Sequence, residues 1–188
     1  MLSWGGGAVT AATALQLPVR NIAAGLQRAD YFTGISIMQV TTDPAHPMMS
    51  GMPEHADVTV QNPPSFLTLD GFEGAVLAKY PKDESPLRSG FLTLGAEKYL
   101  QGFAAALDVK HGIGHVVLLA FNPNWRGQPT GSFRMIFNAL FFAKGVAGQA
   151  KGTPGFWTAP PLPTMPPVDS MSGRGGRGRG GGGGRVET

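Results

Sequence analysis

A chain of 188 residues, 42% of them hydrophobic, is long enough for one domain with a substantial core. It contains no cysteine, which excludes disulfides, thiolate nucleophiles and cysteine-ligated zinc. The net charge of +3 resides in residues 171–188, which hold four arginines and one glutamate, so the neutral remainder has no electrostatic footprint for nucleic acid. No run approaches the roughly 18 apolar residues of a membrane span, and the N-terminus lacks the basic segment of a signal peptide.

The N-terminal part of the chain predicts a strand, a helix and a second strand. Residues 5–12, GGGAVTAA, indicate a turn followed by a short strand. Residues 14–26 carry apolar side chains at a roughly helical spacing, and Pro18 suits the first turn of a helix. Residues 36–40 predict a short strand, and the Pro, Asp and Gly content of 42–53 predicts a loop.

The middle of the chain predicts a series of strands joined by turns. Val58 and Val60 alternate with polar residues, the pattern of a half-buried strand over 57–61. We expect further strands over 66–69 and 75–80, a charged turn over 81–89, and a single helical turn over 96–99.

The strongest pattern lies over 112–142 and predicts a strand, a polar loop and a helix. The Val- and Leu-rich run 115–121 reads as a strand, which a glycine turn joins to residues 103–109 in an antiparallel hairpin. Thr130 or Ser132 can cap the helix with a hydroxyl. The helix has one apolar face, formed by Phe133, Ile136, Phe137, Leu140 and Phe141. A strand, loop and amphipathic helix are half of an α/β unit.

The polar loop of this stretch holds the candidate ligand-binding residues, which are Asn122, Asn124, Arg126, Gln128 and Thr130. Ligands of α/β sheets tend to bind outside the carboxyl ends of strands. The free N–H groups at a helix N-terminus suit an anion. The alternative is that these polar groups cap the helix and satisfy the loop backbone.

We predict no catalytic residue and no metal ligand in this chain. His111 and His115 would lie about 13 Å apart in an extended segment, too far to share one zinc ion. The sequence has no G-x-S-x-G elbow, no GxGxxG fingerprint and no Walker motif.

The composition changes after Phe142, so we divide the chain into a domain, 1–145, and a tail, 146–188. The stretch APPLPTMPPV, 159–168, cannot form a helix or a central strand. Residues 173–185 are nearly pure Gly and Arg and predict disorder. Such segments bind single-stranded nucleic acid weakly, although aromatic residues for base stacking are missing here. The alternative is a basic tail without function.

Several segments together resemble the C-terminal end of large bacterial zinc carboxypeptidase-like proteins of the carboxypeptidase A type. The run HVVLLAFNPNWRGQPTGSFRMIFNALFF is similar to the segment that closes those chains. LPVRNIAAGL, TTDPAHPMMSGMP, AVLAKYP and SGFLTLGAEKYLQGFAAALDV follow in the order of the family, so the resemblance covers 5–143. It implies an α/β fold: a partial flavodoxin-like, class I glutamine amidotransferase-like sheet with flanking helices, which follows a catalytic peptidase domain.

The resemblance also implies what this chain does not contain. The family's zinc ligands, an H-x-x-E pair with a later His, belong to the upstream peptidase domain, and no His here is followed by Glu three residues later. The amidotransferase nucleophile is a cysteine, and this chain has none. Family members also have several strands before the segment that matches 5–12. We therefore expect a fragment without a cofactor of its own, zinc being expected only in the missing peptidase domain.

The function that this resemblance implies is that of a non-catalytic accessory domain. Its expected partner is the peptidase domain of the parent protein, on which it docks or which it stabilises. Members of the family are mostly secreted or periplasmic. Two alternatives stay open: a small-molecule or anion-binding module at 122–130, and weak RNA binding through the Arg/Gly tail.

Overall fold

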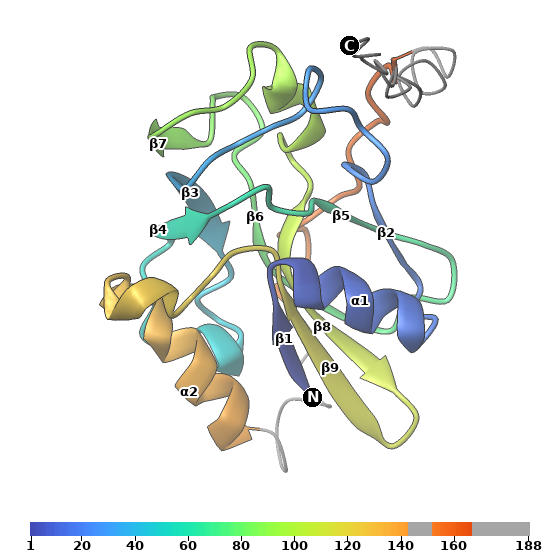
Figure 1. Cartoon of the computed structure of the whole chain (residues 1–188). Helices are drawn as coiled ribbons and strands as arrows, with labels where there is room; N and C mark the ends of the chain where they lie inside the picture. Colours follow the sequence, from blue (N-terminus) through green and yellow to red (C-terminus); the bar gives the residue numbers. More distant parts are fainter. Residues whose placement is uncertain (143–151, 167–188) are drawn as a thin grey trace, which may run out of the picture.

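The computed structural model describes residues 1–142 and 152–166. These residues form one nine-stranded mixed sheet with two flanking α-helices (Figure 1). The main path of the sheet runs through β1 (Leu2–Trp4), β9 (Gly114–Leu119), β8 (Ala104–His111), β6 (Gly74–Lys79), β3 (Ser36–Thr42) and β4 (His55–Val60). The predicted α/β class is confirmed. Along this path β1 pairs with β9 in parallel, and the other neighbours are antiparallel.

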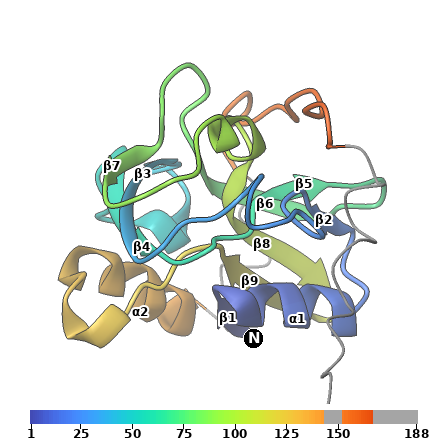
Figure 2. The same ribbon diagram turned by 45° about the horizontal axis from the view of Figure 1, so that its top comes forward.

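Three short strands lie off this path. They are β2 (Val19–Asn21), β5 (Phe66–Thr68) and β7 (Leu87–Ser89). β2 pairs with β5, which touches the start of β8, and β7 pairs with β3. In Figure 2 β7 lies beside β3 at the left, whereas β2 and β5 lie together at the right.

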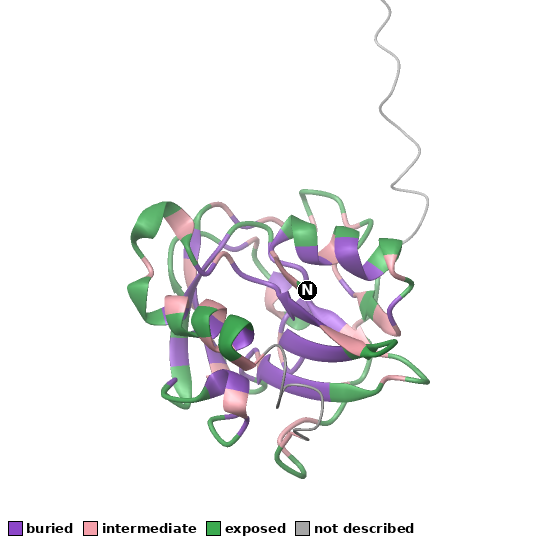
Figure 3. Ribbon diagram, turned by 90° about the horizontal axis from the view of Figure 1, so that it is seen from below, coloured by how far each residue is buried: buried purple, intermediate pink, exposed green. Residues whose placement is uncertain are grey.

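The core gathers around β8, whose residues from Ala104 to Val109 are all buried. A strand in the middle of a sheet that is covered on both faces reads as a continuous apolar run rather than an alternating one. Figure 3 shows the same pattern, with buried residues along the central strands and exposed residues on the outer sides of the helices. Within the described ranges no helix is long and apolar enough to cross a bilayer.

The N-terminal elements correct two predictions. Residues 5–12, expected as a turn and a strand, belong mostly to α1 (Gly6–Ala14), and the strand precedes it as β1. Gly5 turns the chain between them with a φ of 52°, a conformation that favours glycine. The helix then buries three alanines against the sheet, namely Ala8, Ala11 and Ala12. Their i, i+3, i+4 spacing and the helix propensity of alanine are the signals that the strand interpretation passed over.

The helix predicted over 14–26 is absent, and β2 with a series of turns takes its place. The side chain of Asn21 explains the difference, because its Oδ1 accepts hydrogen bonds from the N–H groups of Ala23 and Ser65, at 3.1 Å each. An Asn side chain that bonds nearby backbone competes with helix formation. The second bond also ties this segment to the chain that leads into β5.

The strands predicted in the middle of the chain are confirmed with small shifts of their ends, as β3, β4, β5 and β6. The hairpin of β8 and β9 is confirmed, with His111 opposite Gly114 at its turn. The single helical turn is the 3-10 helix η2 (Ala96–Tyr99). The charged turn over 81–89 was only partly correct, because its end pairs with β3 as β7.

Part of the predicted tail packs on the domain. The N–H and hydroxyl of Thr153 donate to the Asp43 carboxylate at 2.7 and 2.6 Å, and Trp157 Nε1 donates to the Gly102 carbonyl at 2.9 Å. This orange segment of Figure 1 lies in the part of the chain that we divided off as a tail, 146–188, and it packs through these anchor residues without forming a helix or strand. The rest of that range, including the Arg/Gly stretch, lies outside the described residues.

Candidate functional site

The loop of the predicted site is held at both ends by hydrogen bonds to its own and neighbouring backbone. It passes through two 3-10 turns, η3 (Trp125–Gly127) and η4 (Thr130–Ser132), before α2 (Phe133–Phe141). The Asn122 N–H donates to the Thr59 carbonyl at 2.8 Å. The Ser132 hydroxyl reaches the carbonyls of Pro123 and Pro129, at 2.7 and 2.8 Å. The predicted cap is therefore wrong, since no side chain caps α2 and Ser132 closes the loop instead.

Four of the five candidate ligand residues lie on the exposed surface of the described chain. Asn124, Arg126, Gln128 and Thr130 are exposed, whereas Asn122 is half-buried against Gly5. Arg126 has a φ of 49°, and its guanidinium lies 5.7 Å from the centroid of the Trp125 ring. The loop lines neither the pocket beside Asn21 and Arg28 nor the pocket beside Lys79 and Trp157. An anion site here stays a prediction.

The apolar side of α2 faces solvent, contrary to the usual arrangement of an amphipathic helix. Phe137, Leu140 and Phe141 are 59%, 63% and 86% exposed, and we call these three residues the α2 surface. The helix is held from its other side, where Met135 and Ala139 are buried. Asn138 Nδ2 donates to the carbonyls of Met48 and Ser50, at 3.1 and 2.9 Å, and so ties α2 to η1 (Pro47–Met49).

The buried carboxylate of Asp108 and the imidazole of His115 form a close pair of acid and base in the described core. Asp108 Oδ1 lies 3.0 Å from His115 Nδ1 on one face of the β8–β9 hairpin. Burial raises the pKa of Asp108 above its ordinary value, and the adjacent His115 partly offsets this rise. Among the described residues no hydroxyl bonds to His115, and no group of three or more acidic or histidine side chains could hold a metal. The pair therefore lacks the nucleophile that acyl-transfer chemistry requires.

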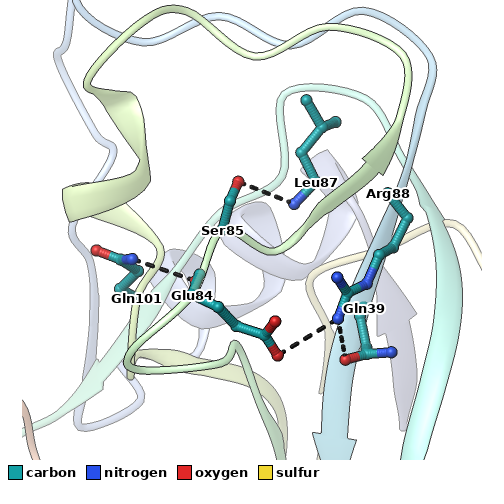
Figure 4. Close-up of polar contacts among 6 residues, drawn as sticks. All are labelled: Gln39, Glu84, Ser85, Leu87, Arg88 and Gln101. Carbon is teal, nitrogen blue, oxygen red and sulfur yellow. Dashed lines mark hydrogen bonds and ion pairs between the residues drawn. The ribbon is translucent and has the colours of Figure 1, made fainter.

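A polar cluster beside β3 and β7 holds the turn before β7 (Figure 4). Arg88 contacts the Glu84 carboxylate at 3.3 Å and also donates to the side chain of Gln39, while Gln101 Nε2 donates to the Glu84 carbonyl at 3.2 Å. Exposed pairs of this kind contribute about 0–1 kcal/mol. The charged groups of this cluster pair with one another, so we interpret the cluster as a structural turn and not as a ligand-binding site.

Comparison with known proteins gives a likeness of fold. The chain matches no protein-family model and no curated protein sequence. Among solved structures it resembles a provisionally named GMP synthase subunit from Thermoplasma acidophilum, with 14% identity and a TM-score of 0.44. The match covers 73% of this chain and 53% of that one, so this chain spans about half the length of its neighbour. The likeness is one of fold alone, and at this TM-score it carries no argument about function.

Proposed function

We propose that this chain is a non-catalytic docking module: a partial, amidotransferase-like accessory domain of a zinc carboxypeptidase-like protein that packs on its peptidase domain. The observation that carries the docking role is the α2 surface, where three large apolar side chains at i, i+3 and i+4 face solvent. The choice of partner is supported by the sequence motifs that resemble that family.

The α2 surface is suited to binding a groove on another protein. Apolar residues at i, i+3 and i+4 are the anchors by which an amphipathic helix lies in such a groove. Full burial of a large apolar side chain contributes about 1.5–3 kcal/mol. Phe137, Leu140 and Phe141 together could therefore supply most of the free energy of a specific contact. The Met135 side of the helix is already occupied by the domain itself.

The arrangement of the loop over 122–130 favours docking over the competing anion site. A binding module would bring Arg126 together with other polar groups in a cleft, whereas here four of the five candidate residues are exposed, and none of the five lines the pocket at Arg28 or the pocket at Trp157. Weak RNA binding through the Arg/Gly tail stays a separate prediction, because that tail lies outside the described residues.

The test begins with the DNA upstream of the Met1 codon, where we expect an in-frame peptidase domain with an H-x-x-E motif. Binding of that domain to this chain is then measured by isothermal titration calorimetry. Serine in place of Phe137, Leu140 and Phe141 together should weaken binding by about 100-fold or more, since at least about 3 kcal/mol of apolar burial is lost.

The matched control replaces Leu94 and Ile113 by serine, because both are fully exposed apolar residues outside α2. This variant should bind the peptidase domain as the parent chain does. Equal binding by the α2 variant, or no binding by the parent chain, would refute the docking role. If the parent chain associates with itself and only the α2 variant does not, then the partner of the α2 surface is a second copy of this chain and not the peptidase domain.

A further inference from the structure

We propose that the pocket bordered by Asn21, Arg28, Phe32 and Asn62 binds a small organic carboxylate that carries an apolar group. We call it the carboxylate pocket. Its volume is about 360 Å³, and it lies between the turns that follow β2 and the chain that leads into β5. It shares no residue with the α2 surface or with the loop over 122–130, so it goes beyond the proposed docking role.

The first donor of the carboxylate pocket is the amide of Asn21. Its Oδ1 is held by the backbone N–H groups of Ala23 and Ser65, so Nδ2 is the free end of the side chain. Nδ2 has no hydrogen-bond acceptor among the described residues. Every fully buried side-chain nitrogen or oxygen of the described residues does have a hydrogen-bond partner. Nδ2 is therefore not fully buried, and Asn21 is one of the residues that line the pocket.

Asn62 supplies a second amide in the same way. Its Oδ1 accepts a hydrogen bond from the Thr33 N–H at 3.0 Å, which again leaves Nδ2 as a donor without an acceptor among the described residues. Its φ of 44° lies in the left-handed region, which asparagine tolerates better than most residues.

Arg28 supplies the only charge in the lining of the pocket. Its guanidinium lies 3.8 Å from the centroid of the Phe32 ring and makes no ion pair with a described carboxylate. No Asp or Glu lines the pocket. The polar lining therefore offers one positive charge and two amide donors. A carboxylate matches it better than a phosphate dianion, because a single guanidinium neutralises one negative charge and binds it in a fork.

The remaining wall of the pocket is apolar. Ala23, Leu26 and Pro63 line it beside Phe32, so they offer a surface to a hydrocarbon or aromatic group next to the carboxylate. Tyr31 also lines it, but its hydroxyl donates to the Pro63 carbonyl at 2.5 Å and is not available to a ligand. The volume lies within the range of small-molecule pockets, about 300–1,000 Å³.

The test uses phenylacetate and its neutral analogue phenylacetamide as probes, with binding to the full chain followed by NMR chemical-shift titration. We expect saturable binding of phenylacetate at residues of the pocket, and binding of the amide weaker by about tenfold or more because it carries no charge for Arg28. Equal binding of the two probes, or no saturation at millimolar concentration, would overturn the proposal.

Two substitutions distinguish binding in the carboxylate pocket from non-specific electrostatic attraction to the chain. Arg28→Gln removes the guanidinium of an exposed residue and should weaken phenylacetate binding by about tenfold. The matched control is Arg20→Gln, which removes an exposed arginine of β2 that does not line the pocket, and it should leave binding unchanged. Equal losses in both variants would show non-specific attraction and would sink the proposal.

The carboxylate can come from a free organic acid or from the C-terminal residue of a peptide. A tripeptide that ends in phenylalanine, compared with the same peptide as its C-terminal amide, distinguishes the two sources. Tighter binding of the free-acid peptide than of phenylacetate supports a peptide C-terminus, and the reverse order supports a free acid. Loss of binding in Arg28→Gln is required in both cases. Because none of these probes involves α2, failure of the docking role leaves the result unchanged.

Discussion

Alanine substitutions at Met135 and Leu140 test which side of α2 holds the helix on the domain. Met135 is 1% exposed and Leu140 is 63% exposed, although both are large apolar residues of the same helix. Truncation of a buried methionine removes its transfer free energy and leaves a cavity, at a cost of about 2–5 kcal/mol. Truncation of an exposed leucine changes the free energy of unfolding by about 0.5 kcal/mol or less.

The assay is urea unfolding of the isolated chain, followed by circular dichroism. With a loss of about 3 kcal/mol and a slope of about 2 kcal/mol per molar urea, Met135→Ala should lower the midpoint by about 1.5 M. The same loss lowers the melting temperature by about 6–12 °C for a chain of this size. Leu140→Ala should superimpose on the parent curve within error.

The opposite result would refute this view of α2. If Leu140→Ala lost about 2 kcal/mol or more and Met135→Ala were neutral, the helix would pack by its apolar stripe, as amphipathic helices usually do. The α2 surface would then be part of the core of the isolated chain. No face of α2 would remain for a partner, and the docking role would lose the observation that supports it.

Two further predictions concern the neighbouring strands β6 and β8. Gly74→Ala should lower the free energy of unfolding by more than about 3 kcal/mol, because the new Cβ would lie 2.0 Å from the Asp108 carbonyl oxygen at a residue whose φ is 146°. Thermal melting measures the effect, and Gly131→Ala is the control, because its new Cβ meets open space. Burial raises the pKa of Asp108, so the folded chain keeps a proton that the unfolded chain releases, and the free energy of unfolding should fall as pH rises above about 4. In urea titrations at several pH values, Asp108→Asn should reduce the dependence of the free energy of unfolding on pH. An unchanged dependence would contradict the raised pKa of Asp108.

Local patterns were sufficient for the elements that form within short stretches of chain. The β8–β9 hairpin is such a case, because its two strands flank a glycine turn and pair with each other. β1 was missed for the opposite reason, since its three residues pair with Leu118 and its neighbours far along the chain. A strand this short has no periodicity to detect, and distant partners decide whether it forms.

The candidate residues divide in the same way. Asn122, Asn124, Arg126, Gln128 and Thr130 could be proposed because they recur at every second position of one short loop between a strand and a helix. Arg28 and Asn62 could not, because each lies in an ordinary turn, and only the folded chain brings both to one pocket. The hydrogen bonds that aim the two asparagine amides come from Ser65 and Thr33, and these partners are also known only from the fold.

The amino-acid sequence alone sets the composition-based limits on this protein. The missing cysteine, the missing H-x-x-E pair and the confinement of net charge to 171–188 depend only on which residues are present. The sequence also located α2 and its apolar stripe. The direction of that stripe depends on the folded chain, because the burial of Met135 and the hydrogen bonds of Asn138 to η1 outweigh the larger apolar side. Helical periodicity records which residues share a face, whereas contacts with the rest of the chain decide which face is buried.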